Sequence, residues 1–128
     1  MGSFSKDVST ALLVNSSAAN WGLHNLTVDG ADRMDYGTAS QLAAGISIEG
    51  AAGGLINNVT VDDVTDGALK NSGDDIGILG YFESASDSLT ITNSTIQGFN
   101  KNGMAFSGGS LTITSNQITG AGLTGVVA

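Results

Sequence analysis

The fold is decided by residues 89–128, where the sequence LTITNSTIQGFNKNGMAFSGGS is followed by a second copy, LTITSNQITGAGLTGVVA. The two copies share apolar and glycine positions that lie 22 residues apart. These positions are Leu89, Ile91, Ile96, Gly98 and Gly103 in the first copy and Leu111, Ile113, Ile118, Gly120 and Gly125 in the second. A fixed period in the twenties predicts stacked repeats, because one repeat is too small to enclose a core and must bury its apolar face on its neighbours.

The same pattern occurs twice more, upstream of residue 89. Aligning the second apolar position of each copy gives one predicted column, made of Val28, Val61, Ile96 and Ile118. Three residues before this column lies a polar position, occupied by Asn25, Asn58, Asn93 and Ser115. Since the first two intervals are longer than 22 residues, the upstream copies carry insertions.

The polar position is predicted to form a tight corner between two short strands. Apolar residues alternate with polar ones on either side of it, which predicts strands with one buried face. Asn tolerates the left-handed backbone conformation and bonds to its own backbone, and stacked Asn side chains can bond to one another. We therefore expect a structural corner in each copy, formed by Asn25, Asn58, Asn93 and Ser115.

A third short strand completes each predicted repeat. The apolar segments at residues 12–14, 46–48, 76–78, 104–106 and 126–127 supply it. Our alignment places Ile46, Ile76 and Met104 in one column of this strand.

Three short strands in each repeat of about 22 residues resemble the right-handed parallel β-helix of the pectate-lyase-like superfamily. This resemblance implies an all-β, single-stranded solenoid of about four to five coils, with one domain over residues 1–128. The pattern is already under way near both ends of the sequence. We therefore expect either a segment of a longer solenoid or a solenoid whose open coil ends are covered by another copy, since unpaired strand edges favour self-association.

Composition and charge exclude some classes of partner. The net charge is −8 with only four basic residues, so neither nucleic acid nor an anionic membrane surface is expected as a partner. No apolar run approaches the roughly 18 residues of a membrane span, which argues against membrane insertion. A Cys-free chain rich in Gly, Ser, Thr and Asn is typical of a bacterial extracellular or cell-surface β protein, although no secretory signal is visible in it.

Three insertions flank the third strand, and long loops on a rigid scaffold are where binding sites usually lie. In the pectate-lyase-like superfamily the resemblance implies a saccharide groove at this strand. The predicted ligand-binding residues are Arg33 and Tyr36 in the first insertion, Asp66, Asp74 and Asp75 in the second, and Tyr81 and Glu83 in the third. The second group could hold Ca²⁺, which prefers oxygen ligands, or supply an acid/base pair for glycoside cleavage. The remaining alternative is that Asp simply favours turns.

Comparison with the family's enzymes shows departures from their catalytic pattern. Residues 64–67 and 73–75 echo two polygalacturonase-like motifs, but Asp66 and Asp74 are too close in sequence to lie one coil apart. Asn102 and Gly103 stand where such enzymes carry a His, and the single His24 is predicted to face solvent.

Threonines form a second repeated surface feature, at Thr90, Thr92, Thr112 and Thr114. A similar pattern occurs in ice-binding solenoids, but two copies make a small plane, and Thr is a good surface residue for a strand. We interpret these residues as strand surface rather than as a binding face.

These observations predict a structural or adhesive extracellular module that contacts polysaccharide through the inserted-loop face. The alternative is a fragment or divergent member of a polysaccharide-processing β-helix enzyme, namely a lyase, hydrolase or epimerase. A groove with paired carboxylates and a cation would favour the enzyme, and scattered solvated Asp residues would favour the scaffold.

Overall fold

The structure, a computed structural model, describes residues 8–15, 19–31, 42–65, 74–120 and 124–127, and within them the chain is all-β with parallel strand pairing throughout. No helix in these residues is long and apolar enough to cross a membrane. The strands are β1 (Val8–Val14), β2 (Gly22–Asp29), β3 (Leu42–Glu49), β4 (Gly54–Asp62), β5 (Asp74–Tyr81), β6 (Ser88–Thr92), β7 (Thr95–Gln97), β8 (Asn102–Ser107), β9 (Ser110–Thr114), β10 (Gln117–Thr119) and β11 (Thr124–Val127).

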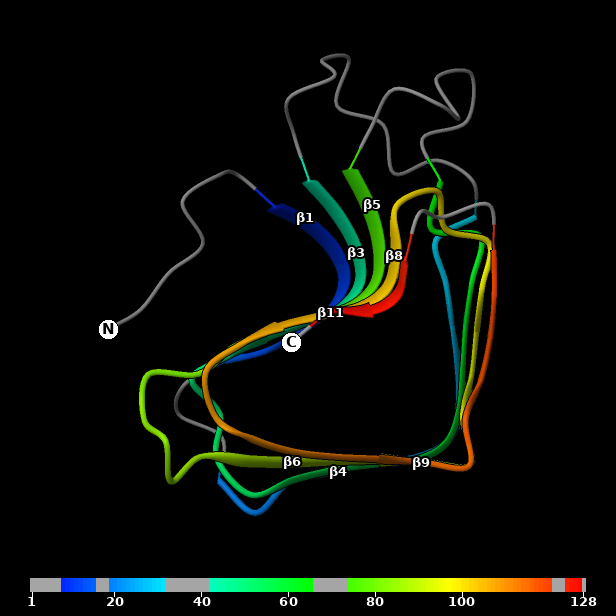
Figure 1. Cartoon of the computed structure of the whole chain (residues 1–128). Helices are drawn as coiled ribbons and strands as arrows, with labels where there is room; N and C mark the ends of the chain where they lie inside the picture. The colour runs from blue at the N-terminus through cyan, green and yellow to red at the C-terminus, as the bar shows by residue number, and fades with distance from the viewer. Residues whose placement is uncertain (1–7, 16–18, 32–41, 66–73, 121–123, 128) are drawn as a thin grey trace.

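The strands form two parallel sheets that share one interior (Figure 1). The five-stranded sheet has the order β1-β3-β5-β8-β11, and the six-stranded sheet has the order β10-β7-β4-β6-β9, with β2 paired to β4. Each passage of the chain through both sheets adds one layer, which we call a row. Row 1 contains β1 and β2, row 2 contains β3 and β4, row 3 contains β5 to β7, row 4 contains β8 to β10, and β11 lies beyond row 4.

The predicted column of Val28, Val61, Ile96 and Ile118 is confirmed by the strand register. Val28 pairs with Val61, Val61 with Ile96, and Ile96 with Ile118. Val61 and Ile96 are fully buried, because each has a neighbouring row on both sides. Burial of such side chains contributes about 1.5–3 kcal/mol each and is the main force that holds the rows together.

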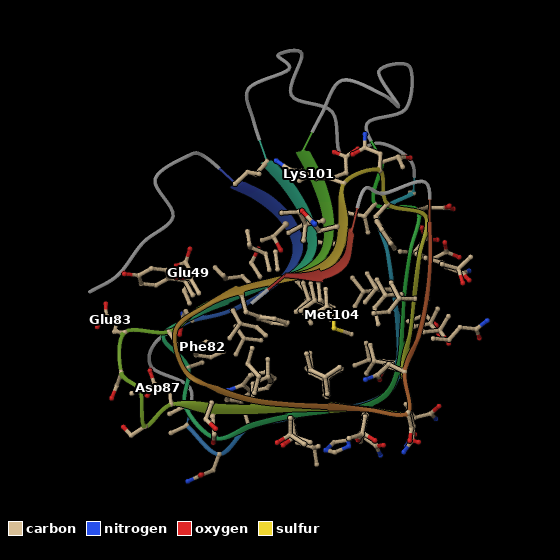
Figure 2. The ribbon with its side chains drawn as sticks, viewed as in Figure 1. Glu49, Phe82, Glu83, Asp87, Lys101 and Met104 are labelled. Atoms are coloured by element: carbon tan, nitrogen blue, oxygen red, sulfur yellow. The ribbon has the colours of Figure 1, made fainter. Side chains whose placement is uncertain are left out.

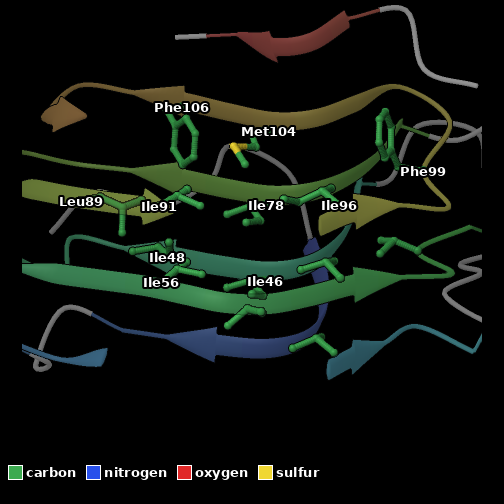
Figure 3. Packing of buried hydrophobic residues seen from close by; sticks show 14 of the residues in the cluster. Ile46, Ile48, Ile56, Ile78, Leu89, Ile91, Ile96, Phe99, Met104 and Phe106 are labelled. Carbon is green, nitrogen blue, oxygen red and sulfur yellow. The ribbon is translucent and has the colours of Figure 1, made fainter. Parts of the chain in front are cut away.

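The predicted column of Ile46, Ile76 and Met104 is wrong by two residues. Ile78, not Ile76, pairs with both Ile46 and Met104, and Figure 3 shows these three side chains above one another in the core. Ile76 instead pairs with Ala44 and belongs to a separate apolar cluster outside the main core. The physical reason is a bend in the strand at Gly77. Residues on either side of it, Ile76 and Ile78, lie on opposite faces although they are two positions apart.

Glycine makes this bend possible, because the interior has no room for a side chain there. A Cβ atom at Gly45 would lie 2.4 Å from Cγ1 of Val61. A Cβ atom at Gly77 would lie 2.3 Å from Cγ2 of Ile96 and 2.5 Å from the carbonyl oxygen of Gly103. The missing side chains let the five-stranded sheet curve inward toward the six-stranded sheet, as Figure 1 shows.

Candidate functional site

The predicted ligand-binding residues that the structure describes lie toward the two ends of one strand. Arg33, Tyr36 and Asp66 lie outside the described residues. The first two insertions precede β3 and β5, whereas the third follows the end of β5. Asp74 and Tyr81 are the first and last residues of β5, separated by about 23 Å measured along the strand at the usual rise of a parallel strand. The part of the candidate site that the structure describes is therefore split between the two ends of the five-stranded sheet.

At the beginning of β5, Asp75 is a buried acid with 1% of its surface exposed. Its backbone N–H donates a hydrogen bond to Oδ1 of Asn100 at 3.1 Å, and its carbonyl oxygen accepts one from the N–H of Lys101 at 3.0 Å. These two bonds tie row 3 to the connection that leads into row 4. For Asp74 the backbone alone is described, as the first residue of β5.

At the end of β5, the polar residues are more exposed. Tyr81 is half-buried and accepts a hydrogen bond at its carbonyl oxygen from the N–H of Gly50 at 2.7 Å. Glu83 is exposed in the loop that follows. Figure 2 shows Glu83, Asp87 and Glu49 at this corner, well away from Lys101. The sequence interpretation missed Glu49, because it closes an apolar strand and belongs to no insertion.

The calcium prediction for Asp66, Asp74 and Asp75 remains open. The described part of the chain contains no group of three or more His, Cys, Asp or Glu residues placed to hold a metal ion. Since Asp66 is outside that part, the predicted group cannot be assembled from the described residues. Calcium binding therefore remains a prediction from the sequence.

Between the two polar ends lies a second buried apolar cluster that the sequence interpretation missed. We call it the outer strip, formed on the outer face of the five-stranded sheet by Ala44, Ile76 and Leu79 with Leu42 and Ala105 packed against them. Ser47 is also buried, and its hydroxyl has no hydrogen-bond partner among the described residues. The available signal was the sequence of β3, LAAGISIE, in which apolar and small residues do not alternate with polar ones, as expected for a strand buried on both faces.

The four predicted corner residues share one backbone conformation. Their φ angles are 54° at Asn25, 55° at Asn58, 51° at Asn93 and 56° at Ser115, all in the left-handed region. Nδ2 of Asn58 donates a hydrogen bond to Oδ1 of Asn25 at 2.8 Å, and Nδ2 of Asn93 donates one to Oδ1 of Asn57 at 3.2 Å. In both bonds the amide of the later row donates to the earlier row.

The residues next to the corner make further bonds between rows that the sequence interpretation missed. Oγ of Ser94 accepts a hydrogen bond from the N–H of Val59 at 3.1 Å. Oδ1 of Asn116 accepts one from the N–H of Ser94 at 2.9 Å, and its Nδ2 donates to the carbonyl oxygen of Ile91 at 2.8 Å. These bonds satisfy backbone groups that the turn would otherwise leave unpaired.

Replacing Asn93 by Val is expected to lower the free energy of unfolding by about 1–3 kcal/mol, because a β-branched residue strains the left-handed conformation and the bond to Asn57 is lost. Asn93→Gly is the matched control, since glycine adopts this conformation without strain and removes only the side-chain bond. Urea denaturation of both variants measures the difference. Equal midpoints for Asn93→Val and the unmodified chain would show that the corner conformation carries no cost.

Comparisons with known proteins found no matching family model, no matching curated protein and no matching solved structure. The pectate-lyase-like resemblance accordingly stays a prediction from the repeated motifs. The geometry of the strands, of the corners and of the polar ends of β5 supplies the argument for function.

Proposed function

We propose that this chain is a right-handed single-stranded parallel β-helix of about four to five coils, and that it serves as a structural or adhesive module outside a bacterial cell. The observation that carries the proposal is the order of the strands. In the five-stranded sheet the strands follow one another in chain order. In the six-stranded sheet β2 pairs with β4, β4 with both β6 and β7, β6 with β9 and β7 with β10, so the rows again follow one another, and all pairs are parallel. The right hand is the hand that nearly all parallel crossover connections adopt.

A mechanical role is favoured by the continuity of the rows. The core runs without interruption through rows 2 and 3, where Ile56 and Ile91 pair across the rows and are fully buried. Side chains outside the core also form hydrogen bonds between rows. Nε2 of Gln97 in row 3 donates a hydrogen bond to Oδ2 of Asp62 in row 2 at 2.7 Å. In such a stack each row is stabilised by the rows next to it, which suits a structural role.

We further propose that polysaccharide contacts the inserted-loop face through the polar residues at the two ends of β5. Sugar rings have apolar faces that pack on apolar or aromatic groups, and hydroxyls that bond to carboxylates. Tyr81 supplies a half-buried aromatic ring and Glu83 an exposed carboxylate at one end of β5, and Lys101 lies at the other end. The distance along β5, about 23 Å, suits an extended oligosaccharide rather than a single sugar.

Binding to arrays of acidic and neutral oligosaccharides, with and without Ca²⁺, tests this contact. Tyr81→Ala and Glu83→Gln are each expected to weaken binding about tenfold, because each removes a stacking or hydrogen-bonding group at the end of β5. Thr112→Ala, on the exposed outer face of β9, is the matched control and should bind as the unmodified chain does. Release of new sugar ends from a bound oligosaccharide would favour the alternative, a polysaccharide-processing enzyme. No binding to any oligosaccharide would refute the contact and leave the structural role.

A further inference from the structure

Glu49 and Tyr81 lie side by side at one end of the five-stranded sheet. They are register partners in β3 and β5, and Tyr81 pairs in turn with Ser107 in β8. Register partners in a parallel sheet are about 4.8 Å apart, and their side chains point to the same face. A carboxylate, a phenol ring and a hydroxyl therefore follow one another across rows 2, 3 and 4.

These three side chains point away from the main core. Ile48 and Phe106, the residues just before Glu49 and Ser107, belong to the core cluster, and successive side chains in a strand point to opposite faces. Glu49 and Tyr81 are half-buried, and Ser107 is exposed. The three polar groups are therefore on the outer side of the sheet, where a ligand could contact them.

Backbone hydrogen bonds hold the rows together at this end of the sheet. The N–H of Gly50 donates to the carbonyl oxygen of Tyr81 at 2.7 Å, and the N–H of Phe82 donates to that of Ser107 at 2.9 Å. These bonds join the residues that directly follow Glu49 and Tyr81 to the next row. The spacing of the three side chains is therefore set by the sheet, and groups held on strands are placed more precisely than groups on loops.

The same end of the sheet carries negative charge. The exposed Glu83 and the half-buried Asp87 follow Tyr81 in the chain, and Figure 2 shows them with Glu49 at one corner. Among the described residues Lys101 is the one Lys or Arg, and it directly precedes β8, at the opposite end of the sheet. A charged ligand beside Tyr81 would therefore meet carboxylates first.

We propose that Glu49 is a specificity-determining residue of the polysaccharide contact proposed above, on which this inference rests, and that it selects polysaccharides with free amino groups. A sugar ring stacked on Tyr81 has its substituents beside the carboxylate of Glu49, one row away. A protonated amine there forms a charge-assisted hydrogen bond, which is stronger than the neutral bond of an N-acetyl group. The carboxylate of a uronic acid would instead meet a like charge, which disfavours binding.

Calorimetric titration with three oligosaccharides of equal length tests this selection. They are a glucosamine oligomer at a pH at which its amines are protonated, its fully N-acetylated form and a uronic acid oligomer. The unmodified chain is expected to bind the amino form about tenfold more tightly than the N-acetylated form, and the uronic acid oligomer most weakly. Added salt should reduce this preference, because the charges are partly exposed to solvent.

Variants of Glu49 identify the residue that makes the selection. Glu49→Gln should reduce the preference for the amino form to less than about threefold, because the amide can form hydrogen bonds but carries no charge. Glu49→Lys should reverse the preference, so that the uronic acid oligomer binds better than the amino form. Asp29→Asn is the matched control, because it removes one negative charge from an exposed residue at the end of β2, in the other sheet, and should leave the preference unchanged. Circular dichroism verifies that each variant is folded.

The outcomes separate this inference from the contact on which it rests. If the N-acetylated or the uronic acid oligomer binds as tightly as the amino form, the contact stands and selection by Glu49 is overturned. If Asp29→Asn reduces the preference as much as Glu49→Gln does, the cause is net charge, and the role of Glu49 is again overturned. If none of the three oligosaccharides binds, the contact itself is refuted and the selection is refuted with it.

Discussion

Ile96→Asp is expected to abolish folding. Ile96 lies in β7 with none of its surface exposed, between Val61 of row 2 and Ile118 of row 4. A carboxylate at this position would be surrounded by apolar side chains, and removing a charge from water without a partner costs several kcal/mol. Most domains of this size are stable by only about 5–15 kcal/mol, and the lost packing of Ile96 adds to the cost.

Thr95→Asp is the matched control for this variant. It adds the same charge one residue earlier in β7, on the half-exposed outer side of the strand. Far-ultraviolet circular dichroism and urea denaturation are expected to show strand structure and a cooperative transition for Thr95→Asp but not for Ile96→Asp. A soluble Ile96→Asp protein that unfolds cooperatively would show that Ile96 does not face the core.

Gly77→Val is expected to have the second largest effect on stability. A Cβ atom at Gly77 would already lie too close to Cγ2 of Ile96 and to the backbone oxygen of Gly103, at 2.3 Å and 2.5 Å. The backbone oxygen cannot move without breaking the pairing of β5 with β8, so the strain cannot be relieved by a side-chain rotation. We expect Gly77→Ala to cost about 2–3 kcal/mol, at the upper end of overpacking effects, and Gly77→Val to cost more.

A double-mutant cycle identifies the clash that causes this loss. Ile96→Ala removes Cγ2, so the cost of Gly77→Ala should be smaller in the Ile96→Ala background than in the unmodified chain. Ala105→Val is a control for added volume, because Ala105 is half-buried on the outer face of the neighbouring strand. Thermal and urea denaturation provide the free energies. Unchanged stability of Gly77→Val would mean that the five-stranded sheet does not approach Ile96 as described.

Much of the stacking could be predicted from the sequence. The copies at residues 89–110 and 111–128 repeat without insertions, so the pairings of Leu89 with Leu111 and of Ile96 with Ile118 follow from the alignment alone. The corner also has a local cause. A left-handed residue between two short strands favours Asn, so the need for that conformation appears directly in the sequence at Asn25, Asn58 and Asn93.

The candidate site was less predictable, because its layout depends on where the insertions join the sheet. Counting residues shows how long an insertion is but not at which end of a strand it begins. The third insertion begins where β5 ends, at Tyr81. It therefore lies almost the whole length of β5 from Asp75, although Tyr81 and Asp75 are only six residues apart in the sequence. The outer strip was missed for a related reason, since burial on an outer face depends on the curvature of the whole sheet.

The sequence by itself determined that the chain forms stacked parallel strands with a polar corner, because a repeated period requires each copy to meet the next in the same way. The tertiary structure alone decided the register of β5. Ile76 and Ile78 are both apolar and two residues apart, so strand alternation places them on the same face and cannot choose between them. The choice is made by Gly77, where the strand bends against Ile96 and turns Ile78 into the core and Ile76 out to the outer strip.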